Sequence, residues 1–154
     1  MGVDLAWQSA TIFGTGNESF FASSPAFVGA VVSAVVERWE KFRGRYICVA
    51  GLQTSANEVV AAVEREMRCK FEVGFVEREE GLAEAERRIG SGFPDAGMFL
   101  VERAVLADEK AFEGFGKDKN IKEELGVKEL RLVNVVRDVV HEFKHHGKGG
   151  CGCG

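Results

Sequence analysis

Glycine pairs are the first candidates for chemistry in this chain, because a Gly-x-Gly-x-x-Gly turn between a strand and a helix can hold a dinucleotide cofactor. The glycines let the backbone approach the pyrophosphate, and the helix N-terminus stabilises its charge. The near match, Gly14-x-Gly16, leads toward Phe20 and Phe21, which are typical of a strand. Residues 147–154 are rich in glycine but have no strand before them. We interpret Gly14 to Gly16 as a turn and predict that this chain alone binds no cofactor.

A proton donor for hydride transfer is commonly a Tyr or Lys beside the substrate. The single tyrosine, Tyr46, is followed four residues later by Ala50, so the chain lacks a Tyr-x-x-x-Lys pair. We predict that Tyr46 packs in the core or at a sheet edge. Cys48 has no His or Asp pattern nearby that would make it a nucleophile, and we predict a small buried apolar residue. We therefore assign no catalytic residue.

Side chains that could bind a metal gather near the C-terminus. They are His141, His145, His146, Cys151 and Cys153. The Cys-x-Cys spacing is tighter than that of usual zinc fingers, and no second ligand pair lies upstream. We interpret this group as a helix end followed by a tail, and we predict no metal site.

Phenylalanines are numerous, with 12 in the chain. Four of them lie where the pattern is least regular: Phe93, Phe99, Phe112 and Phe115. Core packing is the first interpretation, and the alternative is an apolar wall for a flat substrate, since pockets are lined mostly by apolar and aromatic groups. Because loops between rigid elements carry binding groups, we predict that Phe93, Met98 and Phe99 face a substrate pocket.

One segment is typical of a βαβ unit. Arg45 to Gly51 has the composition of a buried strand, and Lys70 to Val76 that of a second one. Between them, Ser55-x-x-Glu58 is a capping box that opens an amphipathic helix. Residues 9–22 predict a hairpin with a turn at Gly14 to Asn17. The predicted fold is α/β, a hairpin plus a small parallel βαβ sheet with several helices.

Further helices follow from capping signals and apolar spacing. Ser24 and Pro25 begin a helix that is apolar nearly all round and therefore needs partners that cover it. Other predicted helices span 77–91, 94–108, a short segment from Asn120 to Gly126, and 128–144. The last has one apolar face, formed by Leu132, Val135, Val136, Val139, Val140 and Phe143. Residues 110–119 predict a loop, and residues 145–154 a disordered tail.

Composition limits the classes of function. The net charge of -4 provides no basic surface, so we expect no nucleic-acid partner. No apolar run approaches the roughly 20 residues that span a bilayer, so we expect no membrane insertion. The acidic runs at 77–86 and 102–113 are interpreted as solvated helix faces. Without a disulfide pattern, reduced thiols in the cytoplasm are the expectation.

Several motifs, taken in order, resemble the NmrA-like, isoflavone-reductase-like family of fungal type, over about Leu5 to Val140. Residues 9–23 resemble its ATIYGDGNT-type segment, and 26–32 its Ala-Asp-Ile-Gly-x-Ala-Val helix start, with Phe27 in place of Asp. Residues 46–66 resemble its strand, Thr-x-x-Asn-Glu turn and helix. Residues 92–95 resemble its Gly-Asp-Phe-Ser segment, and 120–127 its Asn-Glu-Leu-Leu-Gly-Leu close.

The resemblance implies a substrate lobe that accompanies an N-terminal Rossmann half. Residues 1–144 would be the C-terminal part of such a domain, without the half that binds NADP(H) and carries the catalytic residues. The family's substrates are small apolar or phenolic compounds. We therefore expect a truncated reductase that is inactive alone. The alternative is a non-catalytic interaction or regulatory module, which self-associates through exposed apolar surface.

Overall fold

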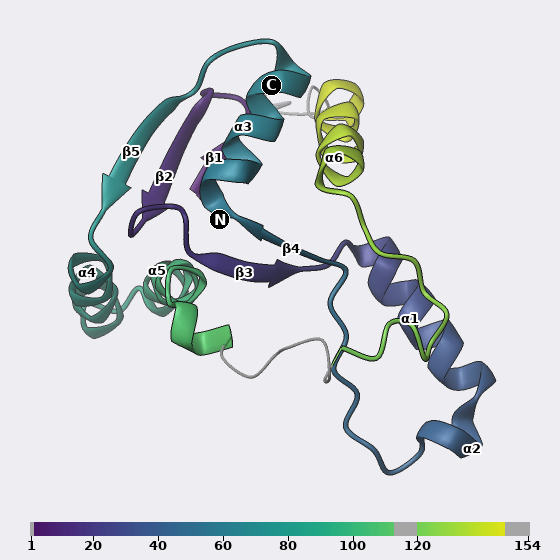
Figure 1. Ribbon diagram of the computed structural model, residues 1–154. Coiled ribbons are helices and arrows are strands. Elements are labelled where there is room, and N and C mark those ends of the chain that lie inside the picture. Colours follow the sequence, from purple (N-terminus) through teal and green to yellow (C-terminus); the bar gives the residue numbers. More distant parts are fainter. Residues whose placement is uncertain (1, 113–119, 147–154) are drawn as a thin grey trace, which may run out of the picture.

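Two small sheets organise the fold (Figure 1). The computed structural model describes residues 2–112 and 120–146. In the first sheet, β1 (Gly2–Asp4) pairs antiparallel with β2 (Ser9–Phe13), and β2 pairs parallel with β5 (Glu72–Val76). In the second, β3 (Ser19–Ala22) pairs antiparallel with β4 (Leu52–Ser55). The α/β class and the parallel pair are thus confirmed.

The partners of the strands differ from the expected ones. β2 and β3 were predicted to pair as a hairpin, but β3 pairs with β4, and the hairpin of the fold joins β1 to β2. Gly14 and Gly16 have positive φ angles of 72° and 79°. The turn that they form directs the chain away from β2, so β3 does not fold back onto it. The parallel partner of β5 is likewise β2, about 60 residues upstream, rather than the strand before α3.

Residues 45–51 were wrongly predicted to be a buried strand. Their one strand-like contact is an isolated bridge between Cys48 and Asn120. A strand needs a neighbouring strand along its whole length to pair its backbone N–H and C=O groups, and the described part of the chain offers residues 45–51 no such neighbour. Tyr46 is fully exposed, and Cys48 is exposed as well. Both were predicted to be packed, so both predictions are wrong.

Local capping explains where the helices begin. In α1 (Pro25–Glu37) the Ser24 hydroxyl accepts a hydrogen bond from the Phe27 N–H at 3.2 Å, as predicted. α2 (Trp39–Phe42) follows as a single turn. In α3 (Ala56–Met67) both hydrogen bonds of the predicted capping box form, between Ser55 and Glu58.

Three further helices are close to prediction: α4 (Arg78–Gly90), α5 (Pro94–Leu106) and α6 (Leu132–His146). The 3₁₀ helix η1 (Glu109–Phe112) was not predicted, since a loop was expected from residue 110. The segment from Asn120 forms turns that end at Gly126, where φ is 67°, rather than the predicted helix. The predicted tail starts inside α6, since His145 and His146 are helical, and residues 147–154 lie outside the described part of the chain.

Two separate apolar cores hold these elements. The main core joins strands of both sheets to α3 and α6, and these two helices lie side by side (Figure 1). Its buried residues include Phe20, Val60 and Val140. The smaller core contains Ala34, Phe42 and Leu125 and lies at the far end of the molecule, around α1 and α2. Among residues 2–112 and 120–146, no helix has both the length and the apolar character needed to cross a bilayer.

Candidate functional site

The Gly14 to Gly16 turn has its backbone donors engaged by the chain itself. The Glu18 carboxylate accepts hydrogen bonds from the Thr15 N–H at 2.9 Å and the Gly16 N–H at 2.8 Å. Burial acts to raise the pKa of Glu18, but these hydrogen bonds outweigh it and the pKa is lowered. A carboxylate therefore occupies the place where this turn could receive an external anion.

The N-terminus of α3 is filled in the same manner. One Glu58 oxygen accepts hydrogen bonds from the Ser55 N–H and from the Thr54 hydroxyl, both at 3.0 Å. The Ser55 hydroxyl accepts the Glu58 N–H at 3.3 Å. The Asn57 N–H donates to the Gly16 carbonyl at 2.9 Å. Helix N-termini bind phosphate through free backbone N–H groups and the positive end of the helix dipole. In this chain the Glu58 side chain, from the same helix, lies where a phosphate would bind.

An apolar pocket lies between the second sheet and α6. Its volume is about 320 Å³, at the lower end of the range of about 300–1,000 Å³ typical of small-molecule sites. β1 and its turn, the second sheet, α3 and α6 contribute the lining residues Val3, Leu5, Phe20, Ala22, Leu52, Thr54, Val59, Val63, Leu132, Val135, Val136 and Val139. Val139 is 50% exposed, so the pocket reaches the surface along α6.

The lining of this pocket is suited to binding an apolar molecule and not to catalysis. Among the described residues that line it, only Thr54 has a polar side chain, and its hydroxyl already donates to Glu58. Its lining therefore provides no acid, base or nucleophile, and the single tyrosine, Tyr46, is fully exposed and is not part of this lining. The pocket suits an apolar molecule that gains its affinity from burial of apolar surface.

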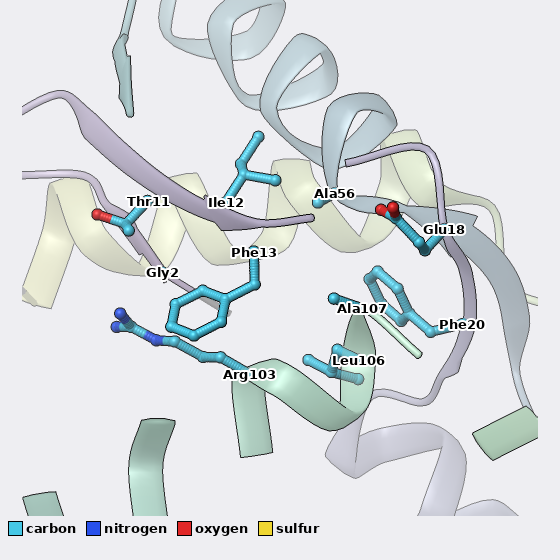
Figure 2. A pocket seen from close by; sticks show the side chains of 10 residues that line it. All are labelled: Gly2, Thr11, Ile12, Phe13, Glu18, Phe20, Ala56, Arg103, Leu106 and Ala107. Carbon is cyan, nitrogen blue, oxygen red and sulfur yellow. The ribbon is translucent and has the colours of Figure 1, made fainter. Parts of the chain in front are cut away.

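A second, smaller pocket of about 30 Å³ lies between α5 and the first sheet, room for about one water molecule. Figure 2 shows Arg103 and Glu18 on opposite sides of it, with Phe13 and Leu106 between them. The Arg103 Nε is buried and has no hydrogen-bond partner among the described residues.

The surroundings of Arg103 act on the charge of its guanidinium group in two ways. Burial lowers the pKa of Arg103, and the neighbouring positive charge of Arg88 adds to the effect. The Phe99 ring lies 4.3 Å from the guanidinium carbon and stabilises the cation through its π face.

The predicted pocket residues lie on α5 and just before it. Phe93 is the residue that precedes α5, and Met98 and Phe99 lie in its second turn. They are 65%, 51% and 49% exposed, and they do not line either pocket described above. Their role in substrate binding stays a prediction.

The apolar pocket was missed as a site because five elements build it. The stripe from Leu132 to Val139 did identify its α6 wall, but only as a core-facing side. The Glu58 capping box was found from spacing. The burial of Arg103 had no signal in the sequence, since it depends on tertiary contacts. Glu18 accepts hydrogen bonds from residues two and three positions before it, so its role is local and could have been found from the Gly-x-Gly-x-Glu spacing of the turn.

Comparisons with known proteins point to oxidoreductases. No protein-family model matches the chain. Over 65 residues, 42% of this chain and 21% of the relative, it is 34% identical to oxidoreductase poxI of Penicillium oxalicum. Over 92 residues, 60% of this chain and 31% of the relative, it is 28% identical to oxidoreductase aprR of Aspergillus flavus. The matched part thus spans between a fifth and a third of these relatives, and it is similar to part of a fungal oxidoreductase.

Proposed function

We propose that this chain supplies the substrate-binding part of an NmrA-like NAD(P)-dependent reductase and that residues 1–154 alone neither bind the cofactor nor catalyse hydride transfer. The observation that carries the proposal is the internal use of the backbone donors. Glu18 occupies the Gly14 to Gly16 turn, and Glu58 occupies the N-terminus of α3. A pyrophosphate at either place would have to displace a carboxylate that is already hydrogen-bonded.

The apolar pocket supports the substrate side of this proposal. A lining of valine, leucine and phenylalanine suits a small apolar or phenolic molecule, and the partial similarity to fungal oxidoreductases supports the oxidoreductase part of the proposal. The proton donor and the nicotinamide would come from a cofactor-binding part outside residues 1–154, so this pocket would hold the substrate rather than transform it.

Calorimetric titration of residues 1–154 with NADPH tests the cofactor half of the proposal. We expect no heat of binding up to millimolar NADPH. Micromolar binding would overturn the proposal, because it would require a phosphate site that the two carboxylates do not already fill.

Titration with 2-naphthol, a small apolar phenol, tests the pocket. Val139→Trp should fill the pocket and abolish binding. Val133→Trp is the matched control, because Val133 is also exposed on α6, at 45% against 50% for Val139, but does not line the pocket. Equal binding by the two variants would place the phenol elsewhere.

A second candidate function is a non-catalytic interaction module. Val28, Val32 and Val36 follow one another at four-residue spacing along α1, and all three are about half exposed or more. Such a row forms one helix face and is the kind of apolar patch that marks an interaction surface. Light scattering tests this candidate, and a clean monomer that binds no hydrophobic dye would contradict it.

A further inference from the structure

The C-terminal end of α6 carries two histidines at the spacing that lets side chains meet on a helix. His141 and His145 are four residues apart, and residues at that spacing are neighbours on one helix face. Their ring centroids are 4.2 Å apart, with an angle of 40° between the ring planes. Both side chains are exposed. The two imidazoles are therefore held together by a regular helix rather than by a loop.

The opposite face of α6 fixes this orientation. Val136 and Val140 are buried in the main core at 6% and 1% exposure. At about 100° per residue, His141 and His145 lie about 140° and 180° around the helix from Val136. They point to solvent as long as α6 packs on α3, and the core need not rearrange for a ligand to reach them.

The geometry of the pair suits one metal ion. A metal binds imidazole nitrogen at about 2.0–2.1 Å, so two rings on neighbouring sites of one ion lie with their centroids roughly 4.5–5 Å apart. The rings are now in contact at 4.2 Å, and because both side chains are exposed, a small rotation of their side-chain torsions brings them to that separation. Imidazole suits zinc, copper and nickel ions. The carbonyl groups at the C-terminus of a helix also favour a cation.

We propose that His141 and His145 form a two-imidazole chelate for a first-row divalent metal ion of the Ni²⁺ and Zn²⁺ type. No three His, Cys, Asp or Glu side chains within residues 2–112 and 120–146 are grouped closely enough to hold a metal. Water completes the coordination of the ion. The chelate bridges two successive turns of α6, and so it stabilises the helix whose other face forms one wall of the apolar pocket.

Titration of the full chain with Ni²⁺, followed by calorimetry, tests the chelate. His145→Ala should weaken Ni²⁺ binding by on the order of 10- to 100-fold, because the second imidazole then no longer binds within the same molecule. Equal affinity of the two proteins would overturn the proposal.

Two double variants separate the spacing from the number of histidines. His145→Ala/Arg137→His places a new imidazole four residues before His141, on an exposed position, and should restore binding. His145→Ala/Asn134→His keeps the same count of histidines but places the new imidazole, at an exposed position, roughly 10 Å along α6 from His141, too far to share one ion, and should not restore it. Restoration by both variants alike would contradict the chelate.

A third variant tests the thiols. Cys151→Ser/Cys153→Ser should leave the Ni²⁺ affinity within about threefold of that of the unmodified chain. A change at a site independent of the two histidines should have only a small effect on their binding of the ion. Loss of binding in this variant, with retention in His145→Ala, would assign the metal to the thiols and overturn the proposal. Circular dichroism at each titration point checks that every variant keeps its helix content.

Discussion

Helices α1 and α6 carry five valines each, but their environments differ. In α6, Val136 and Val140 are buried against the main core, while Arg137, Asp138 and Glu142 are exposed. In α1 none of the five valines is buried, and the helix has no charged residue before Glu37. The comparison teaches that valine content alone does not bury a helix, and that the pattern of charge identifies which face has a partner.

The two helices also belong to cores of different size. Among the described residues, the core to which α6 belongs has ten that are buried, whereas the core to which α1 belongs has three. Arg38 ties the end of α1 to the segment after Asn120, since its guanidinium donates to the Glu124 and Leu125 carbonyls. Polar contacts of this kind fix the position of α1 but leave the row Val28, Val32 and Val36 uncovered.

The largest effect should come from a charge placed at the buried face of α6. Val140→Asp puts an unpaired carboxylate at a position that is 1% exposed, and we expect a loss of about 4 kcal/mol or more in the free energy of unfolding. Urea denaturation measures it. Val139→Asp, at a neighbouring position that is 50% exposed, should cost less than about 1 kcal/mol. Similar losses in both would mean that α6 does not pack as described.

The next effect tests whether the smaller core is independent. Phe42 is 2% exposed in that core, and Phe42→Ala should cost about 3 kcal/mol, the lower end for such a change, because few buried neighbours surround it. Hydrogen exchange should then accelerate in α1 and α2 while the amides of α3 and α6 stay protected. Uniform acceleration over all four helices would show one cooperative unit instead of two.

The pH dependence of α4 gives a smaller effect and tests the ion pairs on the exposed side of this helix. Hydrogen bonds from Arg87, and then from Arg88, lower the pKa of Glu84 to about 2. A carboxylate with a depressed pKa stabilises the folded state above its unfolded pKa, and this contribution disappears as pH falls through the folded value. Glu84→Gln should therefore reduce stability at pH 7 but not at pH 2. An NMR titration of Glu84 with a midpoint near 4.5 would contradict the ion pairs.

Features that depend on neighbours in the sequence were predictable. Ser24 with Pro25, and Ser55 with Glu58, mark helix starts through contacts within four residues, and both caps form as expected. Strand pairing was less predictable, because β2 and β5 are far apart in the chain and residues 45–51 look like a strand without having a partner. A strand-like sequence cannot reveal whether another strand is available.

The candidate site was predictable only in its local parts. The apolar stripe of α6 marked one wall of the pocket, and the four other elements that complete it meet only in the folded chain. His141 was predicted near the end of a helix and His145 in the tail after it, yet α6 continues through His146 and brings His141 and His145 together. Gly147, directly after His146, is a C-terminal helix signal in the sequence, and it marks an end two residues beyond the predicted one.

The smallest effect on stability should come from the uncovered face of α1, and it decides what that face is for. Val32 is 55% exposed, so Val32→Asp should change the free energy of unfolding by no more than about 0.5 kcal/mol. If the row Val28, Val32 and Val36 is an interaction surface, the same change should reduce binding of a hydrophobic dye and shift any self-association toward monomer, because a charge in the middle of a contact must be desolvated. Val133→Asp serves as the control for charge alone, since Val133 is 45% exposed on the other valine-rich helix and does not line the apolar pocket. A loss of stability well above 1 kcal/mol in Val32→Asp would show that α1 is covered within the chain. Unchanged dye binding and unchanged association would show that the row is uncovered but serves no partner.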